Sequence, residues 1–447
     1  MASVKIFRSL PGLVLGCALA LFSIATSAIA APQLTLSPHH VPAAVANLQP
    51  IGRLPASEQL TIAIGLPLRN QDTLSNLLEQ LYDPASTNYH HFLEPQQFAQ
   101  MFGPTPQDYQ ALIDFAQTNG LNVKKTHSNR ALLTVNGAVS NIEKAFHIAL
   151  HVYRHPTEDR TFYAPATEPT LDFNVPVLNI SGLDNWIVPR PMSLHPMPVD
   201  AAKPSATTGS GPSGNFIGKD FGAAYIPGVA LTGTGQSVAL VEFDGYYAVD
   251  INNYEALAGL PNVTLTNITP DGPITIGSGN IEVALDIEMA ISLAPGLTKV
   301  AVYEGNVPDD VLNQIATDKL ANQISASWTY GIDSTTVSIF QQYAAQGQSF
   351  FNASGDSGAY TDTHSGRNPA PTPTDDPYIT IVGGTSLTTT GPGGSYVSEN
   401  TWSWFNTGQG TSASSGGRST RYSIPAWQSG ISMTANHGST TARNLPD

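Results

Sequence analysis

Residues 237–242 read Ser-Val-Ala-Leu-Val-Glu, a largely apolar run that ends on one acid. Four further apolar runs follow, at residues 299–303, 323–328, 349–353 and 378–382. Segments with helical character separate these runs from one another. Strands that are apolar on both faces and alternate with helices are typical of a parallel sheet covered on both sides. The second half of the chain therefore predicts an α/β fold built around a parallel sheet.

The region before it, residues 33–190, has a different pattern, in which short strands alternate with amphipathic helices. Thr105 is a typical N-cap and Gly120 is a typical stop signal, so a helix is expected between them. A strand is expected at residues 131–135, followed by a turn at Asn136-Gly137. This region predicts a self-contained α+β domain.

A linker is expected between these two regions. Pro, Ser, Gly and Thr dominate residues 191–214, without apolar periodicity, as in linkers that are accessible to proteolysis. The chain has 447 residues, which is enough for two hydrophobic cores. We expect a first domain at 31–190, a linker with a processing site at 191–214, and a second domain at 215–447.

The N-terminal segment has the features of an export signal. Lys5 and Arg8 precede an apolar run, and the run closes on Ala28 and Ala30, small residues at the spacing that a signal peptidase requires. We therefore expect residues 1–30 to be a cleaved signal peptide and the mature protein to be secreted, either to the medium or to the periplasm. A membrane anchor is the alternative, but a proline and a glycine interrupt the run. Lipidation of Cys17 is a minor alternative.

Composition excludes several classes of function. Cys17 is the only cysteine and leaves with the signal, so the mature protein has no disulfide and no thiol nucleophile. The formal net charge of −15 argues against a nucleic-acid partner. Only 12% of residues are charged, which suits a protein that works in acid, although any acidic secreted protein is compatible with this value.

The helix expected from Asn280 to Ala294 contains an unusual pair of acids. Apolar residues on nearly every side of it predict that the helix is buried. Glu282 and Asp286 lie one turn apart on one face, where two like charges cost about 0.2–0.5 kcal/mol in a solvated helix and more when buried. One hypothesis is a coupled acid pair that accepts a proton during catalysis. The alternative is two acids at a solvated edge.

The distribution of histidines favours a carboxylate as the catalytic base. Nine of the eleven histidines precede residue 200, which leaves His364 and His437 in the α/β region. Neither lies at the end of an expected strand or helix. A Ser-His-Asp triad is therefore the weaker interpretation, and an acid pair is the stronger one.

Several longer motifs occur in a fixed order along the chain. In the second half they are EVALDIEMAISLAPG (282–296), SASWTYG (325–331), NASGDSGAY (352–360), DPYITIVGGTSL (376–387) and GGRSTRYSIPAWQ (416–428). In the first half they are NYHHFLEPQQFAQMFGPTPQDY (88–109) and LLTVNGAVSNIEKAFHIALHVY (132–153). From about residue 35 to its end, the chain resembles the sedolisins, the kumamolisin-like serine-carboxyl peptidases.

This resemblance implies a fold and a set of site residues. It implies a subtilisin-like catalytic domain preceded by an α+β, ferredoxin-like propeptide that inhibits the enzyme until removed in acid. The family's catalytic Glu and Asp match Glu282 and Asp286, and its oxyanion-hole aspartate matches Asp356. A Glu and a Trp that extend the carboxylate network in some members match Glu242 and Trp328. Ser327, in the SASWTYG motif, is assigned to substrate binding.

The resemblance also raises an expectation about the end of the chain. The family carries its nucleophile in Gly-Thr-Ser-x-x-x-Pro, after a Pro-Asp pair, and this sequence ends at Pro446-Asp447. We expect the peptidase domain to be incomplete and the nucleophile to be absent. Ser357, Ser386 and Ser412 are weak substitutes, with Ser386 the strongest of them. The family binds calcium, and we expect its ligands to lie beyond the last residue.

The leading hypothesis is a secreted, acid-acting serine-type endopeptidase zymogen. Its partners would be polypeptide substrates and its own propeptide as an intramolecular inhibitor, without nucleic acid or stable membrane association. An inactive sedolisin-like binding or inhibitory module is the alternative, and a trypsin-like enzyme that uses Ser357 is a distant third. A further hypothesis is that protonation near pH 6 weakens the hold of the propeptide, although ordinary surface histidines are the simpler interpretation. The residues concerned are His90, His91, His147 and His151.

Overall fold

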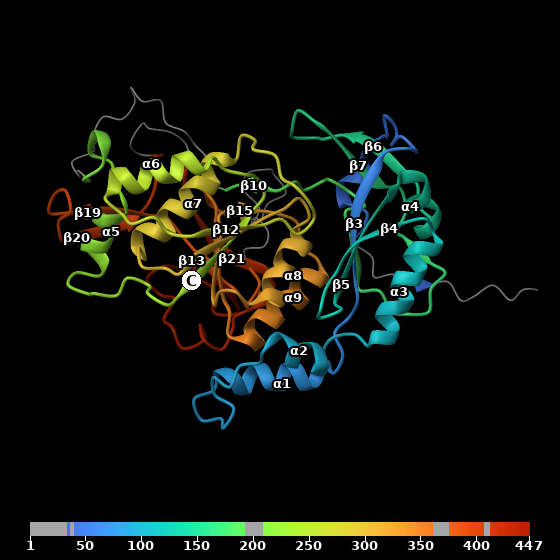
Figure 1. Ribbon diagram of the computed structural model, residues 1–447, viewed down its shortest axis with the longest axis horizontal. Helices are drawn as coiled ribbons and strands as arrows, with labels where there is room; N and C mark the ends of the chain where they lie inside the picture. The colour runs from blue at the N-terminus through green and yellow to red at the C-terminus, as the bar shows by residue number, and fades with distance from the viewer. Residues whose placement is uncertain (1–33, 36–39, 193–208, 361–374, 406–411) are drawn as a thin grey trace, which may run out of the picture.

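The computed structural model describes residues 34–35, 40–192, 209–360, 375–405 and 412–447, and they form two blocks that lie side by side (Figure 1). We use "first block" for the described residues up to 192 and "second block" for those from 209 onward. The signal peptide expected at residues 1–30 lies outside the described residues. Within the described ranges, no helix is both long enough and apolar enough to cross a membrane.

A six-stranded parallel sheet forms the centre of the second block. Its order is β12-β13-β11-β14-β16-β18, and every neighbouring pair is parallel. The strands are β11 (Ser237–Glu242), β12 (Leu265–Ile268), β13 (Lys299–Glu304), β14 (Gln323–Ala326), β16 (Ser349–Ala353) and β18 (Thr380–Val382). The α/β prediction is therefore confirmed, and each of the five apolar runs contains one strand of this sheet.

Helices cover this sheet in two groups. The first group is α5 (Gly218–Tyr225), α6 (Ala248–Ala258) and α7 (Asn280–Leu293), and the second is α8 (Pro308–Asp318) and α9 (Ser334–Gln346). Both α7 and α8 contact β11 and β13, and in Figure 1 these two helices lie on either side of β12 and β13. Val283 and Ile287 of α7 and Leu312 of α8 join the strands in one core.

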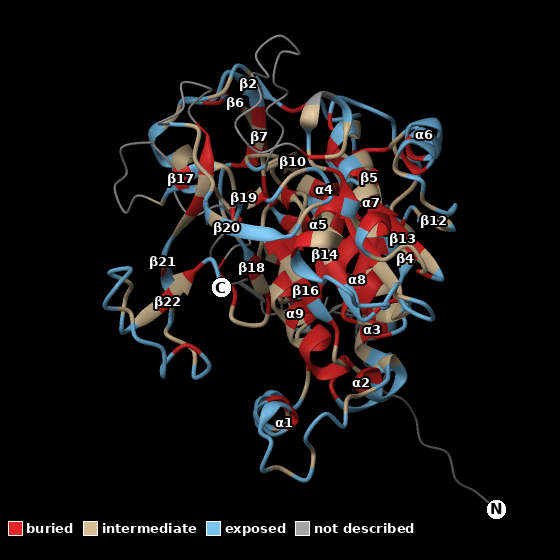
Figure 2. Ribbon diagram, turned by 90° about the vertical axis from the view of Figure 1, so that its left-hand side faces the viewer, coloured by how far each residue is buried: buried red, intermediate tan, exposed pale blue. Residues whose placement is uncertain are grey.

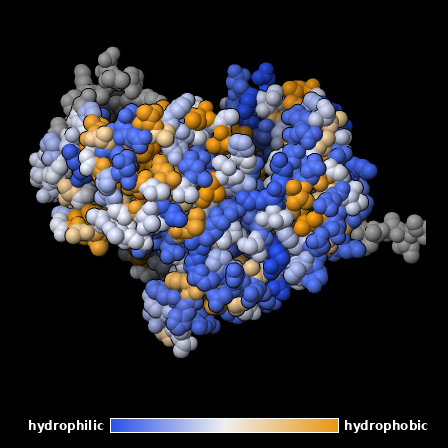
Figure 3. All heavy atoms as spheres, in the orientation of Figure 1, coloured by the Kyte–Doolittle hydropathy of each residue, from blue (hydrophilic) through white to orange (hydrophobic). Residues whose placement is uncertain are grey.

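The expectation that α7 is buried on nearly every side is wrong. Val283, Ile287 and Ile291 are fully buried, but Ile281 is 52% exposed and Leu285 is 41% exposed. The buried residues recur at four-residue spacing, so one stripe of the helix meets the sheet while the opposite side meets solvent (Figure 2). Apolar residues therefore reach the surface over α6 and α7 (Figure 3).

The first block is built on a four-stranded antiparallel sheet with the order β4-β5-β3-β9. The strands are β3 (Gln59–Gly65), β4 (Asn122–Thr126), β5 (Leu132–Ala138) and β9 (Asn179–Ser181), and the connecting helices are α3 (Pro106–Thr118) and α4 (Val139–Phe146). The helix expected after Thr105 is confirmed, because the Thr105 side chain caps α3 by accepting a hydrogen bond from Asp108 N at 3.1 Å. An α+β organisation of this block is thus seen directly.

The turn expected at Asn136-Gly137 is wrong. Both residues lie inside β5, where Asn136 pairs with Thr61 and Gly137 pairs with Leu60 of β3. The helix α4 then begins at Val139 without a loop between strand and helix. The hydrogen-bond ladder to β3 therefore outweighs the local preference of an Asn-Gly pair for a turn.

Smaller elements complete both blocks. In the first block they are β1 (Leu34–Thr35) with β8 (Thr170–Leu171), the sheet of β2 (Gly52–Arg53), β6 (Leu150–Arg154) and β7 (Thr161–Pro165), and the helices α1 (Gln71–Tyr82) and α2 (Pro95–Met101). In the second block they are the sheet of β17 (Ser357–Ala359), β21 (Ala413–Ser423) and β22 (Ala442–Leu445), and the pair β19 (Thr385–Thr389) and β20 (Tyr396–Thr401). The helices α1 and α2 pack against α9, where Tyr82 donates to the carbonyl oxygen of Ala344 at 2.9 Å.

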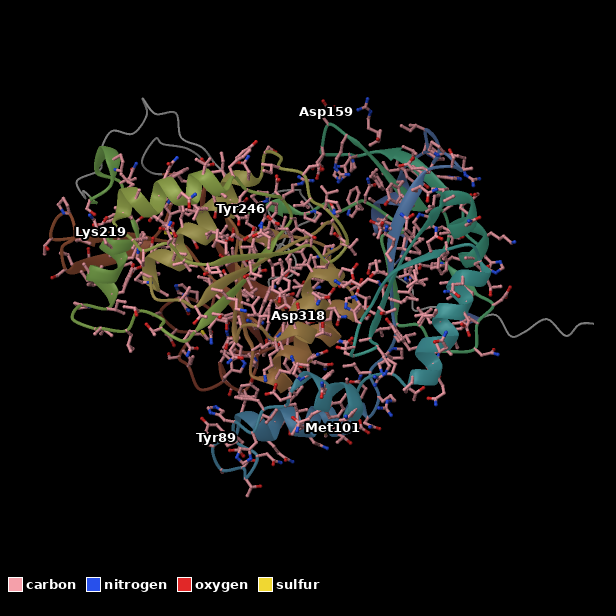
Figure 4. The ribbon with its side chains drawn as sticks, in the orientation of Figure 1. Tyr89, Met101, Asp159, Lys219, Tyr246 and Asp318 are labelled. Carbon is pink, nitrogen blue, oxygen red and sulfur yellow. The ribbon has the colours of Figure 1, made fainter. Side chains whose placement is uncertain are left out.

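Besides the apolar contacts of α1 and α2 with α9, the two blocks meet along α8 and the start of α9 through polar groups, most of which are buried. The His127 ring Nε2 lies 2.8 Å from Asp310 Oδ1, and Thr134 donates to the same oxygen at 2.6 Å. Ser181 Oγ of the first block lies 2.6 Å from both Asp309 Oδ2 and Asp333 Oδ2. Figure 4 shows side chains filling the space between β5 and α8, whose last residue, Asp318, is labelled. We name Asp309, Asp310 and Asp333 the interface cluster.

The four histidines proposed as pH sensors lie elsewhere. His90, His91 and His147 are exposed and His151 is half-buried. His147 pairs with Asp172 of its own block at 3.2 Å, and the His90 ring stacks on Tyr89. The histidine that is buried between the blocks is His127, which the sequence analysis did not single out.

Candidate active site

The carboxyl ends of three neighbouring strands bring the site residues to one edge of the sheet. Glu242 is the last residue of β11, Ser327 follows β14 directly, and Asp356 follows β16 after two residues. These strands are adjacent and parallel in the order β11-β14-β16, so their carboxyl ends meet on one side. In open α/β sheets, this edge is where ligands bind.

Glu242 is completely buried at this edge, beside an indole donor. Trp328 Nε1 donates to Glu242 Oε2 at 2.8 Å, and the Trp328 side chain is itself 2% exposed. Burial, and next the charge of Asp286, raise the pKa of Glu242 well above its usual range, against the hydrogen bond from Trp328. Glu242 is therefore a carboxyl group that holds a proton in conditions where a solvated Glu has lost it.

Asp286 is the second member of this group. Its Oδ1 accepts a hydrogen bond from Ser327 Oγ at 2.7 Å. Burial raises the pKa of Asp286 to about 6, although hydrogen bonds with Ser327 and Glu242 act in the opposite direction. Asp286 Oδ2 and Glu242 Oε1 are both buried without a donor from any other described residue. A proton held by one carboxyl group is therefore the donor available to the other.

Glu282 lies one helical turn before Asp286 in α7 and is 1% exposed. Its charge is one of the causes that raise the pKa of Glu242. We name Glu282, Asp286 and Glu242 the edge cluster; Glu242 and Glu282 are buried, and Asp286 is half-buried with its Oδ2 enclosed. The alternative in which the two helix acids lie at a solvated edge is not the arrangement found.

Asp356 lies in the bend between β16 and β17 and is half-buried. Its carbonyl oxygen accepts a hydrogen bond from Ala413 N at 2.8 Å, which ties this bend to β21. The neighbouring Ser357 is exposed in β17. Asp356 therefore shares the strand edge with the edge cluster, and its assignment as the oxyanion group stays a prediction.

The other serines proposed as weak substitutes for the nucleophile lie in strands or next to them. Ser386 is exposed in β19, where it pairs with Asn400 of β20. Ser412 is buried directly before β21. Neither serine begins a helix, which is the position that the family motif gives to its nucleophile. The hydroxyl group that Asp286 contacts belongs instead to Ser327, which had been assigned to substrate binding.

A short strand from the end of the first block lies directly on the site. Arg190 and Pro191 form β10 (Arg190–Pro191), which pairs antiparallel with β15 (Trp328–Thr329). Met192 N then donates to the carbonyl oxygen of Ser327 at 2.9 Å. The linker expected from residue 191 therefore starts inside a strand. The sequence carries no local signal for this pairing, because two residues of β10 show no alternation.

Calcium was expected from the family resemblance. Among the described residues, no group of three or more His, Cys, Asp or Glu side chains is arranged to hold a metal ion. The described residues thus offer no set of such side chains that fits calcium.

Residues 46–186 match the model of the family described as pro-kumamolisin, activation domain. Over 456 residues the chain is 28% identical to xanthomonalisin of Xanthomonas sp. (strain T-22), in an alignment that covers 88% of this chain and 53% of that protein. The chain thus spans about half the length of this relative.

Two further relatives are covered more fully. Kumamolisin of Bacillus sp. (strain MN-32) is 27% identical over 89% of this chain and 75% of its own length. Sedolisin of Pseudomonas sp. (strain 101) is 28% identical over 89% of this chain and 71% of its own length. A solved structure of Pseudomonas sedolisin, a serine-carboxyl proteinase complexed with pseudo-iodotyrostatin, matches 54% of this chain and 70% of that one, at 24% identity and a TM-score of 0.46.

Proposed function

Because the chain belongs to the sedolisin family and carries its activation domain at residues 46–186, we propose that it is the zymogen of an acid-acting serine-type endopeptidase. The observation that carries this proposal is the pair of carboxyl groups of Glu242 and Asp286, whose outer oxygens are buried beside Ser327; we infer that the two groups share a proton. Such a pair titrates as a unit, and a base with a pKa near the working pH is the effective one for proton transfer.

The edge cluster has the properties of a base that works in acid. A histidine is cationic near pH 4 and cannot accept a proton there. A carboxyl group is neutral when protonated, so burial, which raises the pKa values of Glu242 and Asp286, favours proton uptake by these acids, whereas it opposes the protonated form of a histidine. We assign proton transfer from the attacking hydroxyl to Glu282 and Asp286, with Glu242 and Trp328 extending the network. Asp356, when protonated, would donate a hydrogen bond to the developing oxyanion, where one donor is worth roughly 3–4 kcal/mol.

The strand β10 supports autoinhibition by the first block. A polypeptide substrate commonly binds a protease by adding a strand to an exposed edge, where backbone groups supply the hydrogen bonds. The segment at residues 190–192 occupies such an edge on β15, with Met192 N bonded to the carbonyl oxygen of Ser327. We propose that the first block is an intramolecular inhibitor that fills the position of the substrate backbone. Its sheet order, β9-β3-β5-β4, and its two crossing helices support a ferredoxin-like description.

We leave the nucleophile unassigned. Ser386 remains the weak candidate, although it lies inside the strand β19 and not at the N-terminus of a helix. The proposal also includes a signal peptide at residues 1–30 and secretion of the protein. It places the domain limits at 31–190, 191–214 and 215–447. N-terminal sequencing of the exported protein would test them, and a retained residue 1–30 segment would reject the signal peptide.

The deciding experiment is hydrolysis of a denatured protein between pH 3 and 5 by the product of the full reading frame that contains residues 31–447. Glu282→Ala and Asp286→Ala should each lower kcat/KM by roughly 10²- to 10⁴-fold, as expected for loss of general acid–base catalysis. Asp271→Asn is the matched control, because Asp271 binds the backbone N–H groups of Asn306 and Val307 and is not a member of the edge cluster. Absence of hydrolysis at every pH would favour the inactive module, and activity unchanged in both variants would reject the assigned base.

A further inference from the structure

A fourth acid, Asp244, lies two residues beyond Glu242 at the end of β11 and is 9% exposed. Its Oδ1 accepts hydrogen bonds from Gly245 N at 2.7 Å and Gly277 N at 2.5 Å. Its Oδ2 accepts a hydrogen bond from Gly279 N at 2.7 Å. The carboxylate is thus bound by three backbone N–H groups, two of them from the segment that leads into α7.

The helix α7 has no cap of its own. Its N-cap residue is Gly279, which has no side chain to accept a hydrogen bond from the first turn. Asp244 provides a carboxylate at this position from the neighbouring strand end. A negative charge near a helix N-terminus is favourable, because the exposed N–H groups give that end a partial positive charge. Asp244 therefore acts as a cap supplied from β11.

The backbone of residues 277–279, at the start of α7, lies close to Asp244 and Trp328. A Cβ atom at Gly279 would lie 2.7 Å from Trp328 Cη2 and 2.9 Å from Asp244 Oδ2. A Cβ atom at Gly277 would lie 2.8 Å from Asp244 Oδ2. Any side chain at either glycine would push the start of α7 away from the strand end. The glycines and Asp244 together fix where the helix begins.

The end of β11 therefore contacts α7 at two heights. Asp244 binds the helix start at Gly279, and Glu242 meets Asp286 seven residues later, about 10 Å along the helix axis at 1.5 Å per residue. Two contacts at different heights fix both the position of the helix along its axis and its rotation. A shift of one residue would separate the two carboxyl groups that share a proton.

We propose that Asp244 is a positioning residue, which holds the N-terminus of α7 on the end of β11 so that Glu282 and Asp286 meet Glu242. This inference rests on the proposed function, since it concerns the geometry of the same acids. The carboxylate of Asp244 binds the backbone of Gly277 and Gly279, and it acts on the edge cluster through the helix that it caps.

The ionisation of Glu242 depends both on the charges of nearby acids and on the position of α7, and these two effects must be distinguished. Asp286 and Glu282 of α7 and Glu304 of β13 all act on Glu242, in addition to the Trp328 donor. Burial, and next the charge of Asp244, raise the pKa of Glu304 to about 7. Asp244 could therefore influence the edge cluster by charge alone. Asp244→Glu separates the two effects, because it keeps the charge and moves the carboxylate by one methylene group.

The experiment follows the indole N–H signal of Trp328 against pH by NMR in the full chain labelled with ¹⁵N-tryptophan. Trp328→Phe identifies the signal, which reports the ionisation of Glu242 through the 2.8 Å hydrogen bond. Asp244→Asn and Asp244→Glu should each displace the titration midpoint by about 0.5 pH unit or more, because the carboxyl groups separate. Asp271→Asn removes a comparable carboxylate cap from α8 and should leave the midpoint unchanged.

The outcomes distinguish a positioning role of Asp244 from an effect of its charge alone. Displacement in both Asp244 variants and not in Asp271→Asn supports the positioning role. An unchanged midpoint in Asp244→Glu shows that only charge matters and overturns the proposal, as does an equal displacement in Asp271→Asn. If the Trp328 signal of the unaltered chain shows no titration, the shared proton itself is rejected, and with it the proposed function.

Discussion

The edge cluster and the interface cluster are both groups of buried carboxyl groups in the second block, but they are built differently. Every member of the edge cluster and its donors, Trp328 and Ser327, belongs to the second block. The interface cluster also receives donors from the first block, through His127, Thr134 and Ser181, in addition to Thr335 and Thr336 of its own block. The donors of the first arrangement lie within one block, whereas the second loses part of its donors when the blocks separate.

Proton sharing also differs between the clusters. Ser181 Oγ lies 2.6 Å from oxygens of both Asp309 and Asp333, yet a hydroxyl group has one proton to donate. The second contact is favourable only when a carboxyl group carries a proton. Burial, and next the charge of Asp333, raise the pKa of Asp309 well above its usual range. The comparison indicates that acid favours this contact between the blocks, so proteolysis of the linker, more than acid alone, would separate them.

The largest expected effect comes from breaking the pair between the blocks. His127 and Asp310 have fully buried side chains, and Thr134 donates to the same Asp310 oxygen. Asp310→Ala leaves both donors without an acceptor and should lower the free energy of unfolding of the full chain by about 3–5 kcal/mol. Urea unfolding measures this loss, and a loss below about 1 kcal/mol would mean that the two blocks do not depend on this contact.

A smaller loss is expected inside the edge cluster. Trp328→Phe keeps most of the packing of the ring but removes the Nε1 donor to Glu242. Leaving this buried oxygen without its partner should cost about 1–3 kcal/mol in the free energy of unfolding. Trp427→Phe is a matched control, since Trp427 is 51% exposed. Equal small losses in both variants would contradict the importance of the buried donor.

The pH dependence of the interface cluster is the next effect in size. Because the pKa of Asp309 is raised in the folded chain, its proton stabilises the fold below the ordinary Asp pKa, and this stabilisation is lost as pH rises through the raised value. Asp309→Asn mimics the protonated group, so as the pH rises above about 4 its free energy of unfolding should increase relative to that of the unaltered chain, by at most about 1.4 kcal/mol per pH unit. A pH-independent difference between the two would reject proton sharing at this interface.

The smallest effect is expected at the rim of the interface. Lys319 Nζ lies 2.9 Å from Glu94 Oε1, whose side chain is 69% exposed. Glu94→Gln should therefore change the free energy of unfolding by less than about 1 kcal/mol, and the change should shrink further in high salt. Unfolding curves at low and high salt measure it. If Glu94→Gln lowered the free energy of unfolding as much as Asp310→Ala, the view that buried pairs stabilise the interface more than exposed pairs would be wrong.

Much of the second block could be predicted because its signals are local. Apolar runs such as 237–242 and 349–353 coincide with β11 and β16, since a strand buried on both faces must be apolar throughout. The acids Glu282 and Asp286 stand out because charge is costly in such surroundings. The meeting of Glu242 with Trp328, by contrast, was expected only from the family resemblance, because 86 residues separate them.

The contacts that could not be predicted are long-range and have no local pattern. Asn136-Gly137 reads as a turn until β3 is beside it, and β10 is two residues long and depends on β15. His127 looks like any other histidine of the first block, since its burial depends on Asp310, 183 residues away. Asp244 likewise caps a helix that begins 36 residues later.

The central claim is that Glu242 and Asp286 hold one proton between them. Carboxyl ¹³C NMR of the full chain, with Glu242→Gln and Asp286→Asn to identify the signals, measures this directly as the pH is changed. We expect the two signals to move together, with one proton retained at pH values where a solvated carboxyl group has lost its own, because burial raises the pKa values of both groups. Two independent curves, each with a midpoint near 4 as in solvated carboxyl groups, would contradict the claim.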